Sequence, residues 1–332
     1  MKWTTGLVVA AMLGFSALTG CSGGQADGQG GGEPAGAATA SGPAAAEGGT
    51  FAVITHAGSG DAFWDVVKNG AEAAGRRYGV TVSYQGDGDP ARQSQLVDQA
   101  VSQKADGVVV SMANPDALKE SVEKAVAAGI PVITINSGGD RSREFGAITH
   151  VGQSEEVAGR GAGEKLKAEG VSKLLCVIHE AGNVGLDQRC NGATAGLGGT
   201  VERLQVDVGN LADATSKIKA RLQSDTSLNG VLTLNPAVAV AARDAIADGG
   251  STAKLGTFDL SADVVTAIKD GEILFAVDQQ QYLQGWLPIT FLTLYKDNLN
   301  TVGGGLPVNT GPGFVTKDNA EQVAKLAESG TR

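Results

Sequence analysis

The sequence predicts an α/β protein of two lobes, each built on a doubly wound parallel sheet. From residue 51, short runs rich in β-branched and aromatic residues alternate with helical stretches, which is typical of βαβ units. A second series of the same kind begins near residue 173, and further segments follow its last strand. Such late segments do not suit two independent domains in tandem. We therefore expect the chain to cross between the lobes more than once.

The first series contains strands separated by helices that open on proline. Proline follows Asp89 and Asn114, and an Asp or Asn before proline places a good N-cap at the start of a helix. The expected strands are Phe51–Thr55, Val80–Tyr84, Gly107–Met112, Ile130–Ile135 and a crossing strand at Gly146–Val151, with helices from about Asp61 to Tyr78, from Asp89 and from Asn114.

The second series repeats the pattern and is followed by the late segments. Its expected strands are Lys173–His179, Thr200–Val206, Gly230–Leu234, Lys254–Phe258 and Ile273–Val277, with helices from about Leu186, through Ile218 and Leu222, and from Asn235. After these come a long helix at Tyr282–Tyr295, a Gly/Pro-rich stretch to Pro312 and an amphipathic helix from about Lys317 to Glu328.

The N-terminus resembles a bacterial lipoprotein signal. Lys2 precedes an apolar stretch, Leu7–Ala17, that is too short to span a bilayer, and Leu18-Thr19-Gly20-Cys21 is similar to a lipobox. Residues 1–20 are thus expected to be a signal peptide and Cys21 to be lipidated. An ordinary signal peptide with an incidental cysteine is the alternative. The predicted location is the outer face of the bacterial cytoplasmic membrane, at the cell surface or in the periplasm, with lipid as the only membrane contact.

Composition separates a tether from a folded body and excludes some partners. Residues 21–49 are mostly Gly and Ala without large apolar side chains, so they are expected to form a flexible tether. About 280 residues remain, enough for two lobes of ordinary domain size. The formal net charge of −10, with no run of Lys or Arg, argues against binding to nucleic acid or to an anionic membrane surface.

Two cysteines follow Cys21, namely Cys176 and Cys190. They fall near the start of a strand and of the next helix, and in an oxidising compartment they could form a disulfide. Two buried free thiols are the alternative. No CxxC spacing or neighbouring histidine completes a zinc site, so no metal is expected.

Polar residues collect where the expected strands end. Open parallel sheets bind ligands beyond the carboxyl ends of their strands, and the residues there suit a polyhydroxylated ligand, because carboxylates and amides pair with hydroxyls. Aromatic rings such as Phe63, Trp64 and Phe258 can cover the C–H face of a sugar. Asp259 is the strongest single candidate. Asn114 and Asn235 have an alternative role as helix caps, and Phe63 or Trp64 as core residues.

These residues and their order resemble the ribose- and galactose-binding type of periplasmic solute-binding protein over nearly all of residues 51–332. The motifs that carry the resemblance are Asp61-Ala62-Phe63-Trp64, Gly129-Ile130-Pro131-Val132-Ile133-Thr134-Ile135-Asn136, His150-Val151-Gly152-Gln153, Leu186-Asp187-Gln188-Arg189, Leu234-Asn235-Pro236, Thr257-Phe258-Asp259 and Asp278-Gln279-Gln280-Gln281. The resemblance implies the type I periplasmic-binding-protein fold, with three crossings near Val151, Gln279 and Thr310. Residues 50–150 with 280–310, and 151–279 with 311–332, would form the two lobes.

The resemblance also implies the site and the role. Ligand contacts would fall on Asp61, Phe63, Trp64, Asn136, Asp187, Asn235, Asp259 and Gln279, with Asn114, Asn183, Arg189 and Gln280 as further candidates. Ribose-type members usually have Asp-Arg where this chain has Asn136-Ser137, and commonly an arginine near Asp187. The departures favour another monosaccharide or a sugar alcohol. The implied protein is a monomer without a cofactor that closes around its ligand and delivers it to the permease and ATPase of an ABC importer.

Three other functions remain open as alternatives. The same fold could present a signal molecule to a sensor kinase. A nucleotide-binding enzyme is disfavoured, because Gly58-Ser59-Gly60 is half of a dinucleotide fingerprint with Phe63 at the place of the third glycine, and no Walker lysine follows. His56, His150 and His179 are isolated, so we expect no enzyme. An amino-acid binder would need a cation for the carboxylate, and only Arg189 is near a strand end.

Overall fold

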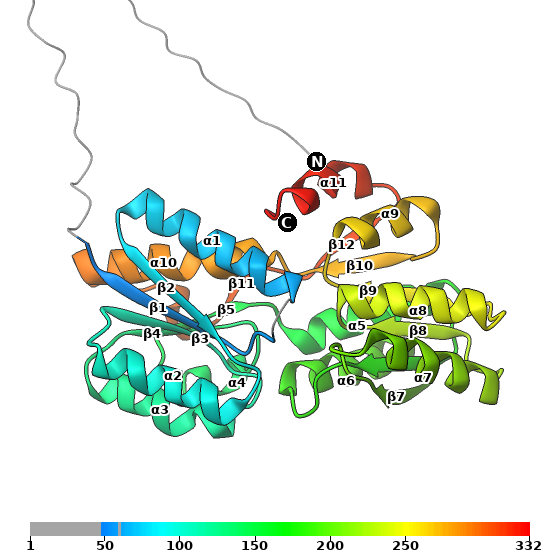
Figure 1. The fold of residues 1–332 in the computed structure, drawn as a ribbon, viewed down its shortest axis with the longest axis horizontal. Helices are drawn as coiled ribbons and strands as arrows, with labels where there is room; N and C mark the ends of the chain where they lie inside the picture. Colours follow the sequence, from blue (N-terminus) through cyan, green and yellow to red (C-terminus); the bar gives the residue numbers. More distant parts are fainter. Residues whose placement is uncertain (1–47, 59–60) are drawn as a thin grey trace, which may run out of the picture. The chain divides into compact units, whose positions relative to one another are not determined.

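The computed structural model describes residues 48–58 and 61–332 (Figure 1). The predicted signal peptide, the predicted lipidation site Cys21 and nearly all of the predicted tether lie outside the described residues. Within the described part the prediction of two α/β lobes with parallel sheets is confirmed.

The first lobe is built on a sheet of strand order β11-β5-β4-β3-β1-β2, in which every neighbouring pair is parallel. Its strands are β1 (Thr50–Thr55), β2 (Thr81–Gly86), β3 (Gly107–Ser111), β4 (Val132–Ile135), β5 (Thr149–Gly152) and β11 (Val308–Asn309). Its helices are α1 (Ala62–Tyr78), α2 (Pro90–Ser102), α3 (Pro115–Ala127), the short α4 (Gly139–Ser142) and α10 (Gln281–Asn298).

The second lobe has the equivalent order β12-β10-β9-β8-β6-β7, with β12 antiparallel to β10 and the other pairs parallel. Its strands are β6 (Lys173–Ile178), β7 (Thr200–Gln205), β8 (Gly230–Thr233), β9 (Lys254–Phe258), β10 (Phe275–Asp278) and β12 (Gly313–Thr316). Its helices are α5 (Glu155–Ala168), α6 (Val184–Leu197), α7 (Leu211–Ser224), α8 (Pro236–Asp248), α9 (Ala262–Asp270) and α11 (Ala320–Glu328).

Helices cover both faces of each sheet, because successive strand residues point to opposite sides. In β1, Phe51 and Val53 pack against α1 and α10, whereas Ala52 and Ile54 pack against α2 and α3. Figure 1 shows these two helix pairs on opposite sides of the first sheet. Burial on both faces explains why inner strands such as β3, β4 and β8 are largely apolar runs.

The chain passes between the sheets three times, after β5, after β10 and between β11 and β12. The predicted caps start helices as expected: the side chains of Asp89, Asn114 and Asn235 accept hydrogen bonds from the first turns of α2, α3 and α8. Because each cap lies two or three residues after the end of a strand, it fixes where the helix begins relative to the carboxyl end of the sheet.

Some elements differ from the prediction. The short strand β11 lies in the Gly/Pro-rich stretch and β12 directly after it, where no apolar run signals a strand. β12 makes the second sheet mixed rather than all-parallel. The strand expected from Gly146 begins at Thr149, because Gly146 has a φ of 85° and belongs to a turn. The last helix begins at Ala320 rather than near Lys317, since Asn319 first closes a turn with Thr316.

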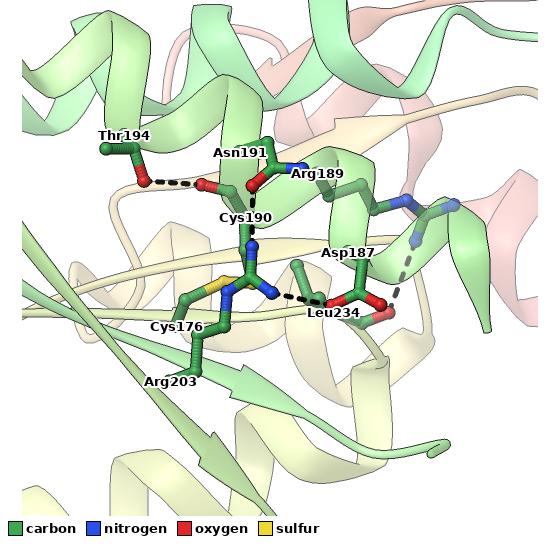
Figure 2. Close-up of a disulfide and its surroundings, with 8 residues drawn as sticks. All are labelled: Cys176, Asp187, Arg189, Cys190, Asn191, Thr194, Arg203 and Leu234. Carbon is green, nitrogen blue, oxygen red and sulfur yellow. Dashed lines mark hydrogen bonds and ion pairs between the residues drawn. A yellow bond between two sulfur atoms is a disulfide. The ribbon is translucent and has the colours of Figure 1, made fainter. Parts of the chain in front are cut away.

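A disulfide joins Cys176 of β6 to Cys190 of α6, and both residues are buried. Their Cα atoms are 6.0 Å apart and their sequence separation is 14. Figure 2 shows the bond beneath the middle of α6, where Cys190 lies. The disulfide therefore attaches α6 to β6, the strand next to the β7 edge of the second sheet.

Removal of this bond is expected to destabilise the chain. A loop of this length corresponds to about 3 kcal/mol in the chain-entropy description of disulfides. We expect the Cys176→Ala/Cys190→Ala double variant to unfold in denaturant with that loss of free energy, and reduced wild type to behave alike. The prediction would be contradicted if the double variant and reduced wild type unfolded at the same denaturant midpoint as unreduced wild type. Alkylation of Cys176 and Cys190 in unreduced wild type would also contradict it.

Candidate functional site

A cavity of about 410 Å³ lies between the carboxyl ends of the two sheets. Residues of both lobes line it. A hollow of about 510 Å³ adjoins it, but that hollow is lined by first-lobe residues alone. Most of the predicted contacts line the cavity between the lobes, namely Asp61, Phe63, Trp64, Asn136, Asn183, Arg189, Asn235, Asp259 and Gln279.

Asp187 is not brought to this cavity. Its carboxylate is about half exposed, 49%, and its Oδ1 accepts a hydrogen bond from Arg203 Nη1 at 2.7 Å (Figure 2). Residues two apart on a helix point in nearly opposite directions, because each residue turns the helix by about 100°. Arg189 takes the buried side of α6, so Asp187 faces β7 and solvent, and the prediction of a ligand contact there is corrected.

Three further residues serve the fold rather than the cavity wall. Asn114 caps α3 by accepting from the N–H of Ala117 at 3.2 Å. Gln280 lies at the crossing after β10, where its Nε2 donates to the carbonyl oxygen of Thr310 at 2.6 Å. Phe258, expected as a covering ring, is fully buried in the second-lobe core. Its ring lies 4.5 Å from the guanidinium of Arg189, so it supports the site from beneath.

A row of polar side chains connects the two lobes across the cavity. Asn136 Nδ2 donates to Gln279 Oε1 at 3.1 Å, and Gln279 Nε2 donates to Asp259 Oδ1 at 2.6 Å. All three residues are buried. Asn136 and Asp259 have φ values of 61° and 68° at the ends of β4 and β9, a conformation that costs free energy and concentrates at functional sites.

Arg189 carries a charge that is already paired. Its Nε and Nη2 donate to the two oxygens of Glu155 at 2.6 and 2.9 Å, and its Nη1 lies 3.7 Å from Asp259 Oδ2. All three side chains are buried. Sequence analysis did not find Glu155, because it opens α5 far along the chain from Arg189 and no spacing signals the pair.

Two carboxyl groups of the cavity, those of Asp259 and Asp61, have pKa values raised above the usual value for aspartate. Burial raises the pKa of Asp259 to about 7, although Arg189 and the hydrogen bond from Gln279 act in the opposite direction. Burial also raises the pKa of Asp61, against the hydrogen bond from the N–H of Phe63. A ligand that donates hydroxyl hydrogens to these carboxyls would favour their ionised forms.

Aromatic rings form the first-lobe wall. Trp64 meets His56 edge-to-face at a centroid distance of 4.7 Å and Phe63 at 4.9 Å. His56 follows β1, and its Nδ1 hydrogen-bonds Ser111 Oγ at 2.7 Å. His56 and His179 both line the cavity, although the sequence showed them only as isolated histidines. Their position at the ends of β1 and β6 was the signal that could have found them.

Contacts along the rim join the lobes around the cavity. The N–H of Val184 donates to the carbonyl oxygen of Ala113 at 3.0 Å, and Gln188 Nε2 donates to Asp140 Oδ2 at 2.7 Å. Asn183 also accepts from the Ser137 hydroxyl of the first lobe at 3.2 Å. The structure therefore shows the lobes closed on each other.

No group of three or more His, Cys, Asp or Glu side chains in the described part of the chain could hold a metal ion. Among the helices of residues 48–58 and 61–332, none has the length and apolar character needed to cross a membrane. The described residues that line the cavity offer hydrogen bonding by carboxylates, amides and imidazoles beside aromatic rings.

Comparisons with known proteins agree with this architecture. Residues 51–298 match the family described as Periplasmic binding protein domain. A carbohydrate transporter from Acidothermus cellulolyticus, solved in complex with myo-inositol, is 42% identical, with a TM-score of 0.84 over 85% of this chain and 99% of that chain.

Two curated relatives are more distant. Xylose/arabinose-binding protein XylF of Sulfolobus acidocaldarius and ribose import binding protein RbsB of Bacillus subtilis are each 26% identical over 68% of this chain. The matches span 60% of the length of the first and 74% of the second. The chain therefore matches less than two thirds of XylF.

Proposed function

Because the chain belongs to the Periplasmic binding protein domain family, we propose that it captures a monosaccharide or cyclic sugar alcohol outside the cytoplasm and delivers it to an ABC importer. The observation that supports this proposal best is the row of hydrogen-bonded side chains Asn136, Gln279 and Asp259, which joins both lobes across the cavity. A ligand with hydroxyls around a ring can bond to both ends of this row at once, and so hold the lobes together.

Myo-inositol is the ligand we favour within this class. Its six ring hydroxyls match a cavity whose walls are carboxylate, amide and imidazole, and Phe63 and Trp64 offer an aromatic surface to its C–H groups. The 42%-identical transporter protein holds the same compound. The substitution of Asn136-Ser137 for Asp-Arg also supports a ligand other than ribose.

The charges of the site disfavour an amino acid or another anion. Among the described residues that line the cavity, Arg189 is the one Arg or Lys, and Glu155 binds it in a bidentate pair. A ligand carboxylate would have to compete with Glu155 while approaching Asp259. A neutral ligand meets no such cost. Among the described residues that line the cavity, no hydroxyl or thiol side chain bonds to a histidine, so we propose a carrier and not an enzyme.

The remaining parts of the proposal concern where and with what the protein works. We propose that Cys21 is lipidated after signal cleavage and that residues 22–49 tether the two lobes to the outer face of the membrane. The partners would be a permease and its ATPase, which would receive the ligand from a monomer. The motif before Cys21 and the low-complexity tether support this arrangement.

A thermal-shift panel tests the function directly. The panel contains myo-inositol, pentoses, hexoses and acyclic polyols, with amino acids as the contrasting class. Ligand at about 1,000 times its Kd stabilises by about 4 kcal/mol, so we expect at least one neutral polyol to raise the Tm by roughly 10 °C. A shift with an amino acid and with no sugar or polyol would contradict the proposal.

A further inference from the structure

Histidines follow equivalent strands in the two lobes. The strand orders of the two sheets place β1 and β6 at the same position, second from one edge, and His56 and His179 come directly after them. Both histidines line the cavity. The carboxyl ends of β1 and β6 thus present one imidazole each to the cavity.

The two imidazoles differ in how their nitrogens are used. His56 Nδ1 is held by Ser111 Oγ at 2.7 Å, and its Nε2 lies 3.8 Å from Glu180 Oε2 of the other lobe. His179 Nδ1 is buried and has no hydrogen-bond partner among the described residues. Four buried side-chain atoms of the described residues lack a hydrogen-bond partner, and they belong to Gln153, His179 and Gln281. Of these three residues, His179 is the one that lines the cavity.

An unpartnered imidazole in a binding cavity has a cost that a ligand can remove. Neutral histidine offers one donor and one acceptor, and leaving a buried group unpaired costs free energy. Burial, with Arg189 and His56 nearby, lowers the pKa of His179 to about 3, so the ring is neutral at physiological pH. A half-turn about the Cβ–Cγ bond would put a ring carbon in the buried position and bring Nδ1 to the opposite edge of the ring.

We infer that His179 hydrogen-bonds one ring hydroxyl of the bound polyol and thereby helps to select the ligand. This inference rests on the proposed function. A hydroxyl both donates and accepts, so it matches either nitrogen of the neutral ring. A cavity that pairs each hydroxyl rejects an analogue that lacks one, because the protein group is then left without a partner. His179 would discriminate at one position of the ligand ring.

Calorimetric titration of the wild-type chain and His179→Leu with myo-inositol and its monodeoxy analogues tests this role. We expect wild type to bind one of the analogues at least tenfold more weakly than myo-inositol. His179→Leu should bind myo-inositol at least tenfold more weakly than wild type does, and should bind that one analogue as well as it binds myo-inositol. His179→Gln, which keeps a donor and an acceptor, should recover part of the discrimination.

The outcomes separate this inference from the function on which it rests. If wild type binds myo-inositol and His179→Leu binds it equally well, the role of His179 is wrong while the function stands. An equal loss for every analogue would also overturn the role, because it would indicate a general disturbance of the cavity. If wild type binds no myo-inositol, both the favoured ligand and the inference fail. The Tm of ligand-free His179→Leu should be no lower than that of wild type, since the buried Nδ1 that it removes has no hydrogen-bond partner among the described residues.

Discussion

Replacing Asp259 by asparagine is expected to reduce the affinity for the polyol ligand on the order of 100-fold, which corresponds to about 3 kcal/mol. The Asp259 carboxylate is buried, faces the cavity and accepts from Gln279 at 2.6 Å. Asparagine keeps the size of the side chain but has one acceptor oxygen where the carboxylate has two. Calorimetric titration with myo-inositol at pH 8 measures the loss.

The same variant should be at least as stable as wild type without ligand at pH 8. The folded state raises the pKa of Asp259 from 3.8 to about 7, so it binds the proton more tightly than the unfolded chain does. The stability linked to this group is therefore full below pH 3.8 and is lost as the pH rises through 7. Asparagine does not ionise, so the variant does not lose this stability at pH 8. The Glu155–Arg189 pair stays intact.

The pH dependence of binding has the opposite sign. Hydroxyls that donate to Asp259 favour the ionised carboxylate, so its pKa in the bound state should lie below the value of about 7 in the free protein. Wild-type affinity should then be full above pH 7 and fall as the pH is lowered below 7, by at most tenfold per unit. Between pH 5.5 and 8.5 the affinity of Asp259→Asn should change less than that of wild type.

Asp187→Asn is the matched control for these measurements. It makes the same chemical change at a carboxylate that is about half exposed and pairs with Arg203 outside the cavity. Its affinity should stay within about twofold of wild type, because surface ion pairs contribute about 0–1 kcal/mol to stability and this one does not face the ligand. Wild-type affinity in Asp259→Asn, or equal losses in both variants, would remove Asp259 from the site.

Breaking the buried pair of Glu155 and Arg189 is expected to destabilise the protein by about 3–5 kcal/mol. Glu155→Leu leaves the guanidinium without its bidentate partner, and Arg189→Met leaves the Glu155 carboxylate buried near Asp259. In a protein of this size such a loss lowers the Tm by roughly 10 °C. Calorimetric unfolding of each single variant without ligand measures it.

The double variant Glu155→Leu/Arg189→Met is the informative comparison. Replacing both members of a buried pair by apolar residues of similar size is often neutral, because no charge is left unpaired. The double variant should therefore lie closer to wild type than either single variant does. If its loss equals the sum of the two single losses, the side chains do not act as a pair.

Local chemistry is the part of the fold that the sequence predicts best. Asn114-Pro115 and Asn235-Pro236 place helix starts to the residue, because capping depends on neighbours in the chain. The short strands β11 and β12 depend instead on partners far away in sequence, and their two to four residues carry no periodicity. The antiparallel placement of β12 beside β10 is set by the third crossing and not by its own residues.

The strand-end rule predicts most of the cavity wall for a similar reason. It locates Asn136, Asn235 and Asp259, because every parallel strand of a sheet delivers its last residue to the same edge. The rule cannot predict which way a side chain points from a helix whose first residue is not known. For this reason the sequence wrongly placed Asp187 in the cavity. Nor can it find Glu155, whose role depends on the buried guanidinium that it meets.

The central claim is that the cavity between the lobes binds a neutral cyclic polyol. Calorimetric titration of wild-type protein with myo-inositol at pH 8, repeated with Asp259→Asn, tests it most directly. The account predicts one binding site per chain in wild type and a loss of affinity on the order of 100-fold in the variant. Absence of binding in wild type, or the same affinity in both proteins, would contradict it.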